Sequence, residues 1–286
     1  MTTFTDATGR MPDPIKRAIE HYDTSHVRRG DISVTELIDS PLMFWLRKNR
    51  ADQLMASYQS RMFALYGSVM ASILEKFGGE LAEVRGEIVR NGVTISGSAD
   101  LAFDKGALVD YKFTSVFVAK DGGNSRIVDH WTKQVNLYRI MLPNHAVDRL
   151  SIAMILRDWG PRYRNEVPEP FVQIDVPKWS VVEAEGYIQE RLALFDGVIS
   201  RNEMPAQCSD EERWLSDFAV TKVGLKKAVK AGFQTRKEAQ AYINGLKGDT
   251  SIYAVRDAKP KRCAEYCDFG ACGLCPYYKP ENESED

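Results

Sequence analysis

The chain has 286 residues, of which 44% are hydrophobic and 27% are charged, a composition that excludes general disorder. It carries 38 lysines and arginines against 40 aspartates and glutamates, so the formal net charge is -2. This balance excludes histone-like or tail-driven nucleic-acid binding, and any such contact must come from a local basic patch.

The amino-terminal segment shows no feature of a secretory signal. Its first twenty residues include acidic side chains and two prolines, and they contain no apolar core. The longest uncharged run, 62–74, has 13 residues, whereas a membrane helix needs about 20. We therefore expect a cytoplasmic protein without membrane contact, in which cysteines stay reduced.

The first expected elements are helices. Ser33-Val34-Thr35-Glu36 is a capping box that predicts a helix start, and Ser40-Pro41 predicts a second start shortly afterwards. Apolar residues recur three and four apart from 52 to 77, which predicts a long helix that ends at Gly78-Gly79.

Strands are expected next, where the pattern shortens and turns separate apolar runs. The predicted strands are 84–90, 93–96, 98–103 and 107–113. They are followed by a helix at 128–142, strands at 149–156 and 170–175, and a helix at 178–199. Beyond a boundary near residue 203 we expect short helical segments and one strand, 251–256. These elements predict an α/β protein.

Two aspartates and a lysine fall on neighbouring strands of this region. The three residues after Phe103 suit a hairpin turn that pairs Phe103 with Ala107. In that register Asp100 lies opposite Asp110, and Lys112 shares their face because side chains alternate along a strand. Close carboxylates repel each other unless a cation lies between them, and Mg²⁺ or Mn²⁺ suits oxygen ligands. The alternative is a solvated cluster of salt bridges.

This region resembles the PD-(D/E)XK nuclease superfamily in its RecB-like exonuclease branch. Gly97-Ser98-Ala99-Asp100 matches the G-x-x-D strand, and Asp110-Tyr111-Lys112 matches the (D/E)-x-K strand. Gln134 and Tyr138 match the Q-x-x-x-Y helix, a face that borders the active site and contacts DNA in the family. The resemblance implies a restriction-endonuclease-like core, with a mixed central sheet flanked by helices.

The resemblance also implies a set of roles at the site. Asp100 and Asp110 would be metal ligands, the Tyr111 carbonyl a third ligand, and Lys112 the catalytic lysine. The family has G-x-x-x-H-x-x-L-E on the preceding helix, but here Ala71 stands in the histidine position. Glu75 then remains as the helix carboxylate that reaches the ion directly or through water.

Four of the five cysteines lie within 13 residues near the carboxyl end. Four thiolates suit a structural Zn²⁺ or an iron–sulfur cluster, and irregular spacing that ends in Cys-Pro favours iron–sulfur. Many RecB-like nucleases bind a [4Fe–4S] cluster through a local triplet and one distant cysteine, which here implies Cys208, Cys263, Cys267 and Cys275. Cys272 is then the spare thiol, and the alternative set is the four local cysteines.

Two segments have compositions that suit nucleic acid. Six basic residues and no acidic residue lie between 222 and 237, among them Lys226, Lys227 and Lys230, which predicts a salt-dependent grip on DNA. The segment 157–164 interleaves arginines with Trp and Tyr, a pattern that suits stacking on single-stranded bases. The alternative for both is an ordinary solvated surface.

The expected organisation has three parts: a leader at 1–30, a PD-(D/E)XK core at 31–203, and an α-rich subdomain at 204–286 that holds the basic stretch and the cysteine cluster. The resemblance implies a metal-dependent DNA exonuclease of phage or bacterial recombination, replication or end processing. Its partners would be single-stranded DNA or duplex ends and a recombination or replication protein. The alternatives are a structure-specific endonuclease and a non-catalytic DNA-binding or assembly subunit.

Overall fold

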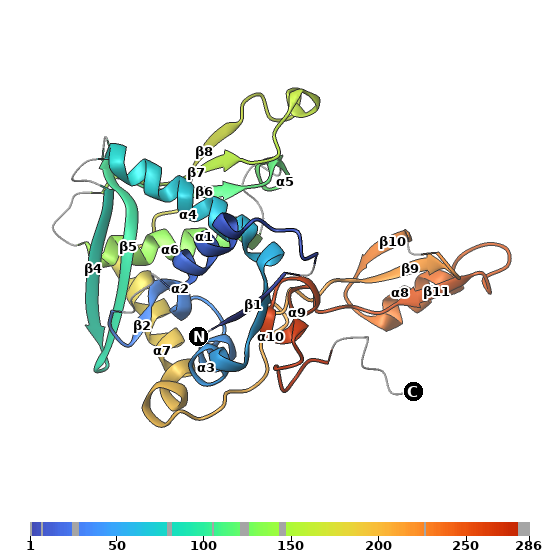
Figure 1. Ribbon diagram of the computed structural model, residues 1–286. Helices are drawn as coiled ribbons and strands as arrows, with labels where there is room; N and C mark the ends of the chain where they lie inside the picture. The colour runs from blue at the N-terminus through green and yellow to red at the C-terminus, as the bar shows by residue number, and fades with distance from the viewer. Residues whose placement is uncertain are drawn as a thin grey trace. The chain divides into compact units, whose positions relative to one another are not determined.

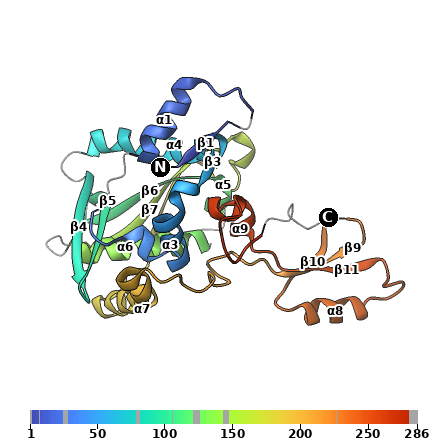
Figure 2. The same ribbon diagram turned by 60° about the horizontal axis from the view of Figure 1, so that its bottom comes forward.

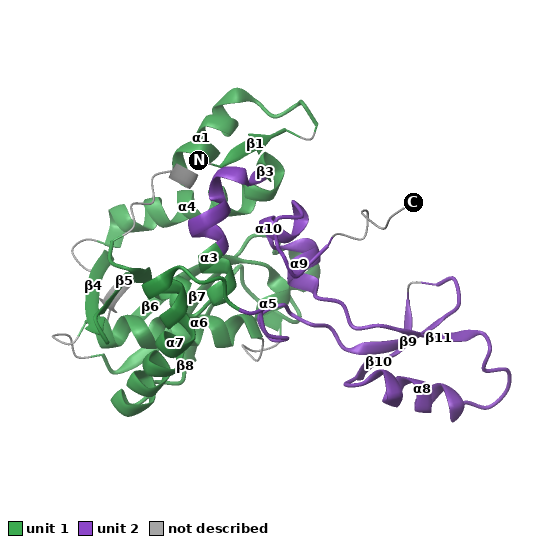
Figure 3. Ribbon diagram, turned by 90° about the horizontal axis from the view of Figure 1, so that it is seen from below, with its two compact units in different colours: residues 1–45, 56–205 green, residues 46–55, 206–286 purple. Residues whose placement is uncertain are grey.

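The computed structural model describes residues 2–6, 8–24, 29–78, 82–104, 106–120, 126–142, 147–225 and 227–279 (Figure 1). They form two compact units (Figure 3). Unit 1 comprises residues 1–45 and 56–205, and unit 2 comprises residues 46–55 and 206–286. Both units combine helices with sheets, which confirms the predicted mixed α/β class. No helix within these described ranges is long and apolar enough to span a membrane.

Unit 1 is built on a six-stranded mixed sheet. Its strands are β2 (Ile32–Ser33), β4 (Ala82–Arg90), β5 (Val93–Asp104), β6 (Ala107–Thr114), β7 (Arg149–Leu156) and β8 (Phe171–Val176). Its helices are α1 (Asp13–Thr24), α2 (Val34–Leu37), α4 (Tyr58–Gly78), α5 (Val116–Lys120), α6 (Arg126–Met141) and α7 (Val181–Arg201). In Figure 2, α4 lies above the sheet, and α6 and α7 lie below it.

Local signals set the starts of several helices. Ser33 and Ser180 cap α2 and α7 in complete capping boxes, and α3 (Pro41–Arg50) begins at its proline. The long helix α4 begins at Tyr58 rather than at residue 52, so the predicted start is wrong. The preceding residues form the 3-10 turn η1 (Ala51–Gln53) and strand β3 (Met55–Ser57), which pairs with β1 (Thr3–Thr5).

The strand order is β2-β5-β6-β7-β8, and β4 covers the other edge of β5. The turn between β4 and β5 has two residues, Asn91 and Gly92, with positive φ angles of 51° and 78°. Strand β6 runs parallel to β7 and is connected to it through α5 and α6, while β8 is antiparallel to β7. Strand β5 continues through Gly97, where the sequence predicted a break.

The main core of unit 1 lies between the sheet and α6 and α7. Leu108 of β6 and Ile152 of β7 are fully buried there, together with Val135 of α6 and Phe195 of α7. A hydrogen bond also joins α7 to α2: Arg191 Nε donates to the Leu37 carbonyl at 2.9 Å. The core therefore fixes α6 against the strands that carry the predicted aspartates.

Unit 2 contains a three-stranded antiparallel sheet of order β10-β9-β11. Its elements are β9 (Phe218–Lys222), β10 (Ala228–Phe233), α8 (Arg236–Asn244), β11 (Tyr253–Arg256), α9 (Lys261–Glu265) and α10 (Asp268–Ala271). Val220 packs with Ala239 and Ile243 of α8 to form its core. The sequence predicted one strand in this region, 251–256, and missed β9 and β10. Strand β10 is exposed along most of its length, so it has no alternating apolar pattern.

The unit boundaries differ from the predicted domains at two places. Within unit 2, Arg50 Nη1 donates to the Leu274 carbonyl at 2.6 Å, so residues 46–55 group with the carboxyl-terminal part. Within unit 1, Phe4 stacks on Tyr58 at 5.1 Å, and the Tyr58 hydroxyl donates to the Glu20 carboxylate. The described part of the predicted leader is therefore packed into unit 1 and does not form a separate segment.

Candidate functional site

The candidate site lies where two strands of unit 1 separate. Along one edge of β5, strand β2 pairs at Ile95 and Ser96, and β6 pairs from Leu101 onward. Among the described pairings, residues 97–100 have no strand partner on this edge. On the opposite edge they pair with β4. Asp100 lies at the separation, and its Oδ2 accepts a hydrogen bond from the Tyr111 backbone N–H at 2.8 Å.

The register of β5 and β6 brings the two predicted aspartates together. Leu101 pairs with Val109, and directly beyond this last pair Asp100 Oδ2 accepts the Tyr111 N–H, which brings Asp100 close to Asp110. This is the juxtaposition that the sequence predicted.

The turn between these strands differs from the prediction. Asp104, and not Phe103, pairs with Ala107, because the register shifts by one residue after Ala102. Such a bulge accommodates one extra residue while it leaves the pairing beyond it unchanged. The predicted pairing at the turn is therefore wrong, although the alignment at the aspartates is kept.

Asp110 and Lys112 form a buried ion pair. The Asp110 side chain is 1% exposed, and Lys112 Nζ lies 2.6 Å from its Oδ2. The approach is short but poorly aligned, so within the described residues Oδ2 accepts no well-formed hydrogen bond. The structure thus shows an attractive contact that still leaves this buried oxygen incompletely satisfied.

Burial changes the protonation of both carboxylates. Burial, and next the charge of Asp110, raises the pKa of Asp100 to about 7, although Lys112 and the Tyr111 N–H oppose the shift. Burial also raises the pKa of Asp110, while the charge of Lys112 lowers it. Two buried carboxylates with raised pKa values favour a bound cation, which would offset the cost of keeping both ionised.

Helix α6 holds Lys112 in place. Lys112 Nζ donates to Gln134 Oε1 at 3.0 Å, Gln134 Nε2 donates to the Tyr138 hydroxyl at 2.7 Å, and the Trp131 ring centroid lies 5.8 Å from Nζ. Gln134 and Tyr138 are 7% and 6% exposed, so they offer little surface to DNA. The predicted DNA contact by this pair is therefore corrected: in this structure the two side chains position Lys112.

A pair of glycines lets α6 approach the sheet. Gly86 of β4 pairs with Gly97 of β5. A Cβ atom on Gly97 would lie 2.7 Å from Tyr138 Cε1, and one on Gly86 would lie 2.8 Å from Met141 Cβ. The glycine of the G-x-x-D motif is thus required by the tyrosine of the Q-x-x-x-Y motif. The sequence motifs did not single out Gly86.

Gly97→Ala is expected to destabilise unit 1 and to displace Lys112 through Tyr138 and Gln134. Overpacking of this kind costs about 1–3 kcal/mol, measurable as a lower urea midpoint. The matched control is Gly67→Ala, since a Cβ on Gly67 of α4 meets no atom within 4 Å. That variant should unfold at the same or a higher urea concentration. Equal stability of both variants would contradict the close packing of α6.

Glu83 is a further acidic residue that the sequence motifs did not indicate. The register of β4 and β5 places it opposite Asp100, and its Oε2 accepts a hydrogen bond from Ser98 Oγ at 2.7 Å. Its charge contributes to the raised pKa of Asp100. The sequence could have indicated this position of Glu83, because the two-residue Asn91-Gly92 loop pairs Arg90 with Val93 and so fixes the register of β4 and β5.

The structure does not bring Glu75 to the aspartates. Glu75 lies on an exposed face of α4, and no group of three His, Cys, Asp or Glu side chains arranged for a metal exists among the described residues. The role that the resemblance implied for Glu75 is therefore corrected. The remaining donors still suit Mg²⁺ or Mn²⁺, because such ions commonly bind one or two carboxylates together with water and substrate phosphates.

The cysteines lie in unit 2. Burial, followed by Cys267 and Cys275, raises the pKa of the Cys263 thiol, so these three thiols are electrostatically close. Cys272 is exposed, and its Sγ donates to the Met55 carbonyl at 2.9 Å. Cys208 is half-buried in the segment before β9, and next to it Gln207 Nε2 donates to the Tyr277 carbonyl at 3.4 Å. All five lie in the described ranges, and there they form neither a disulfide nor the geometry of a metal centre.

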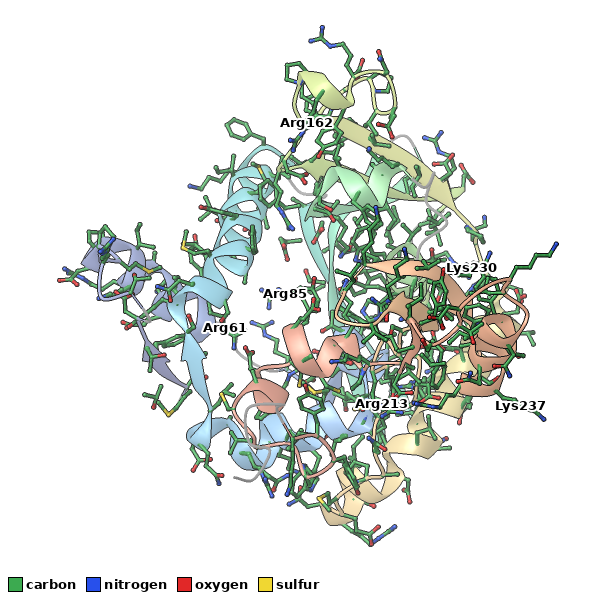
Figure 4. All side chains as sticks on the ribbon, turned by 90° about the vertical axis from the view of Figure 1, so that its right-hand side faces the viewer. Arg61, Arg85, Arg162, Arg213, Lys230 and Lys237 are labelled. Atoms are coloured by element: carbon green, nitrogen blue, oxygen red, sulfur yellow. The ribbon has the colours of Figure 1, made fainter. Side chains whose placement is uncertain are left out.

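The two predicted nucleic-acid segments have different environments. Lys227 and Lys230 are exposed, and Figure 4 shows Lys230 and Lys237 projecting from unit 2, while Lys226 lies outside the described residues.

In the second segment, the Trp159 and Tyr163 rings are half-buried against the core of unit 1. Trp159 Nε1 donates to the Val167 carbonyl at 2.9 Å, and Lys120 Nζ lies 4.7 Å from the Tyr163 ring centroid. These two rings are therefore engaged within the fold.

No protein-family model and no curated protein matches the chain. The crystal structure of SSO0001 is similar to this structure with a TM-score of 0.43 and 18% sequence identity. The similarity covers 63% of this chain and 83% of that chain. It is too low to support an inference about activity.

Proposed function

We propose that the protein is a metal-dependent DNA nuclease of the RecB-like exonuclease kind, acting on single-stranded DNA or duplex ends. The observation that carries the proposal is the convergence of Asp100, Asp110 and Lys112 at the separation of β5 and β6. A solvated salt-bridge cluster, the alternative for these residues, does not explain a carboxylate that is only 1% exposed. The motif resemblance supports the same function.

In this proposal Asp100 and Asp110, with the Tyr111 carbonyl, hold the Mg²⁺ or Mn²⁺ ion. A bound ion of this kind lowers the pKa of water and neutralises charge on a phosphodiester. Gln134 accepts a hydrogen bond from one of the three N–H donors of Lys112, and Asp110 holds the ammonium by charge. In the proposal a remaining N–H donates to a phosphate oxygen, where the ammonium stabilises the negative charge that develops during in-line attack.

The test is degradation of end-labelled single-stranded and blunt duplex DNA with Mg²⁺, with Mn²⁺ and with EDTA. Metal-dependent loss of linear DNA, as single strand or as duplex, with a covalently closed circle left intact, is the expected result. Cleavage of the circle would instead show the structure-specific endonuclease. Binding without degradation under every condition would instead show the non-catalytic subunit.

We further propose that unit 2 binds a [4Fe–4S] cluster through Cys208, Cys263, Cys267 and Cys275. The support is the proximity of three of these thiols and the separate engagement of Cys272 with Met55. The cluster would have a structural role, joining α9 and α10 to the segment before β9. Many nucleases of the resembling branch carry such a centre.

Anaerobically purified protein is expected to be brown, with a broad visible absorption that Cys263→Ser removes and Cys272→Ser preserves. The two variants are a matched pair, because both replace a cysteine of the same short segment. If Cys272→Ser also removes the absorption, the ligands are the four local cysteines. Colourless protein with stoichiometric zinc would refute the iron–sulfur proposal.

A further inference from the structure

A pocket of about 450 Å³ opens in unit 1 at the carboxyl ends of the parallel strands β6 and β7. It is lined by Phe63 and Tyr66 of α4, Phe113 of β6, and Arg157 and Asp158 beyond β7. Its volume lies within the roughly 300–1,000 Å³ that is typical of ligand sites. Arg157 and Asp158 belong to the segment 157–164 that the sequence predicts for single strands, whereas Phe63, Tyr66 and Phe113 belong neither to a predicted nucleic-acid segment nor to the proposed catalytic groups.

The aromatic rings of this pocket are unusually exposed. Phe63 is 56% exposed and Tyr66 is 45% exposed. The rings meet edge to face, with centroids 6.3 Å apart for Phe63 and Tyr66 and 6.2 Å apart for Tyr66 and Phe113. This arrangement fixes the rings against one another while part of each remains open to solvent. Such surfaces in soluble proteins commonly mark binding sites.

A cation completes the pocket. The Arg157 guanidinium carbon lies 4.3 Å from the Phe63 ring centroid, a cation–π distance. Asp158 also lines the pocket, and its Oδ1 accepts a hydrogen bond from the Val116 backbone N–H at 2.7 Å, which caps α5. Arg162, which projects from the loop between β7 and β8 in Figure 4, and Arg164 are also exposed.

Stacking rings beside a guanidinium suit an unpaired nucleobase and its phosphate. Aromatic faces stack on bases of any sequence, and arginine adds both stacking and charge. A base inside a duplex has both faces covered by its neighbours and cannot enter such a pocket. A purely apolar partner would cover the Arg157 guanidinium without offering it a hydrogen-bond acceptor.

The position of the pocket relates it to the candidate site. Phe113 directly follows Lys112 on β6, and although their side chains point to opposite faces, both lie at the carboxyl end of the strand. Open α/β sheets bind ligands outside the carboxyl ends of their strands. The pocket and Lys112 therefore lie at the same end of β6, on opposite faces of the sheet.

We propose that this pocket binds an unpaired base of single-stranded DNA and so selects single strands for the Asp100–Asp110 site. The inference rests on the proposed nuclease function for the fate of the strand, but not for its binding.

The test is fluorescence anisotropy in EDTA with a labelled single-stranded oligonucleotide and the blunt duplex of the same sequence. Phe63→Ala and Tyr66→Ala should each weaken binding of the single strand by roughly 5-fold to 150-fold, and leave duplex affinity within about 2-fold. Phe63→Trp, which keeps a stacking face, should retain the affinity. The matched control is Phe77→Ala, since Phe77 is also on α4, is 86% exposed and does not line the pocket.

Three results would overturn the inference: no single-strand binding by the unaltered protein, unchanged affinity in both alanine variants, or the same loss with the duplex or in Phe77→Ala. The outcome is separable from that of the nuclease proposal, because EDTA removes cleavage from the measurement. If the ring variants weaken binding but no DNA is ever degraded, the nuclease proposal fails and the pocket stands. If DNA is degraded but the ring variants bind single strands normally, the pocket proposal fails and the nuclease stands.

Discussion

Asp110→Asn and Lys112→Ala are each expected to lower the rate of DNA degradation by about 10³-fold or more. Asparagine keeps the shape of the aspartate but removes the charge that pairs with Lys112 at 2.6 Å and that would hold the metal ion. Alanine at 112 removes the ammonium that stabilises charge on the phosphate. The measurement is the initial rate of release of end-labelled nucleotides at saturating Mg²⁺.

A matched control comes from the same unit. Asp129 and Lys133 form an i,i+4 pair on α6 with a separation of 2.7 Å, but Asp129 is 57% exposed. Asp129→Asn therefore removes the carboxylate of an aspartate–lysine ion pair outside the candidate site. It should leave the rate of DNA degradation unchanged. Circular dichroism of each variant shows whether the fold persists. Degradation at the normal rate by folded Asp110→Asn and Lys112→Ala would end the nuclease proposal.

Much of unit 1 could be predicted because its signals are local. The capping boxes at Ser33 and Ser180 set helix starts through side chain contacts three residues away. The Asn91-Gly92 loop fixes the β4–β5 register through backbone angles that glycine and asparagine tolerate. The proximity of Asp100 and Asp110 follows from such short-range geometry, and the bulge near the turn did not alter it.

Other features depended on contacts that no local pattern contains. Glu75 has the spacing of the family motif, but tertiary packing of α4 sets which face of the helix is turned to solvent. Gln134 and Tyr138 have the expected spacing on one helix face. Their burial, however, depends on the close approach of α6 to the sheet at Gly86 and Gly97, which have no side chains. Spacing along a helix predicts neighbours but not the surface that those neighbours meet.

The aromatic pocket shows the same limit more clearly. Phe63, Phe113 and Arg157 come from three separate segments, and only the sheet and α4 bring them together. Of these the sequence indicated only Arg157, and as stacking rings it favoured Trp159 and Tyr163, which are packed into the fold. In unit 2, the edge strand β10 is mostly exposed, so its sequence has no alternating apolar pattern that would predict its pairing with the central strand β9, which carries Val220.

The stability of the metal-free protein is expected to fall as pH rises from 5 to 8. The folded-state pKa of Asp100 is about 7, whereas an aspartate in the unfolded chain has the ordinary pKa of 3.8. Between these values the folded state binds a proton that the unfolded state releases, so the free energy of unfolding decreases with increasing pH. The stabilisation is fully present below about pH 4 and is lost as pH rises through 7. The loss between pH 5 and 8 amounts to roughly 2–3 kcal/mol.

The groups that face Asp100 account for this direction. Asp110 on β6 and Glu83 on β4 raise the pKa of Asp100, and Lys112 on β6 lowers it. The two aspartates in turn raise the pKa of Tyr138 on α6. Burial exceeds each of these contributions. Asp110, whose pKa burial also raises, contributes in the same direction.

Urea unfolding in EDTA at pH 5 and pH 8 measures the effect, and Asp100→Asn isolates it, because asparagine does not titrate. The variant should lose less stability than the unaltered protein over this range. Millimolar Mg²⁺ should restore stability to the unaltered protein, more at pH 8 than at pH 5, since the ion binds ionised carboxylates. Asp110→Asn should show little of this restoration. Identical pH profiles for the unaltered protein and Asp100→Asn would mean that Asp100 is ionised without cost, and an Mg²⁺ effect that survives Asp110→Asn would place the ion elsewhere.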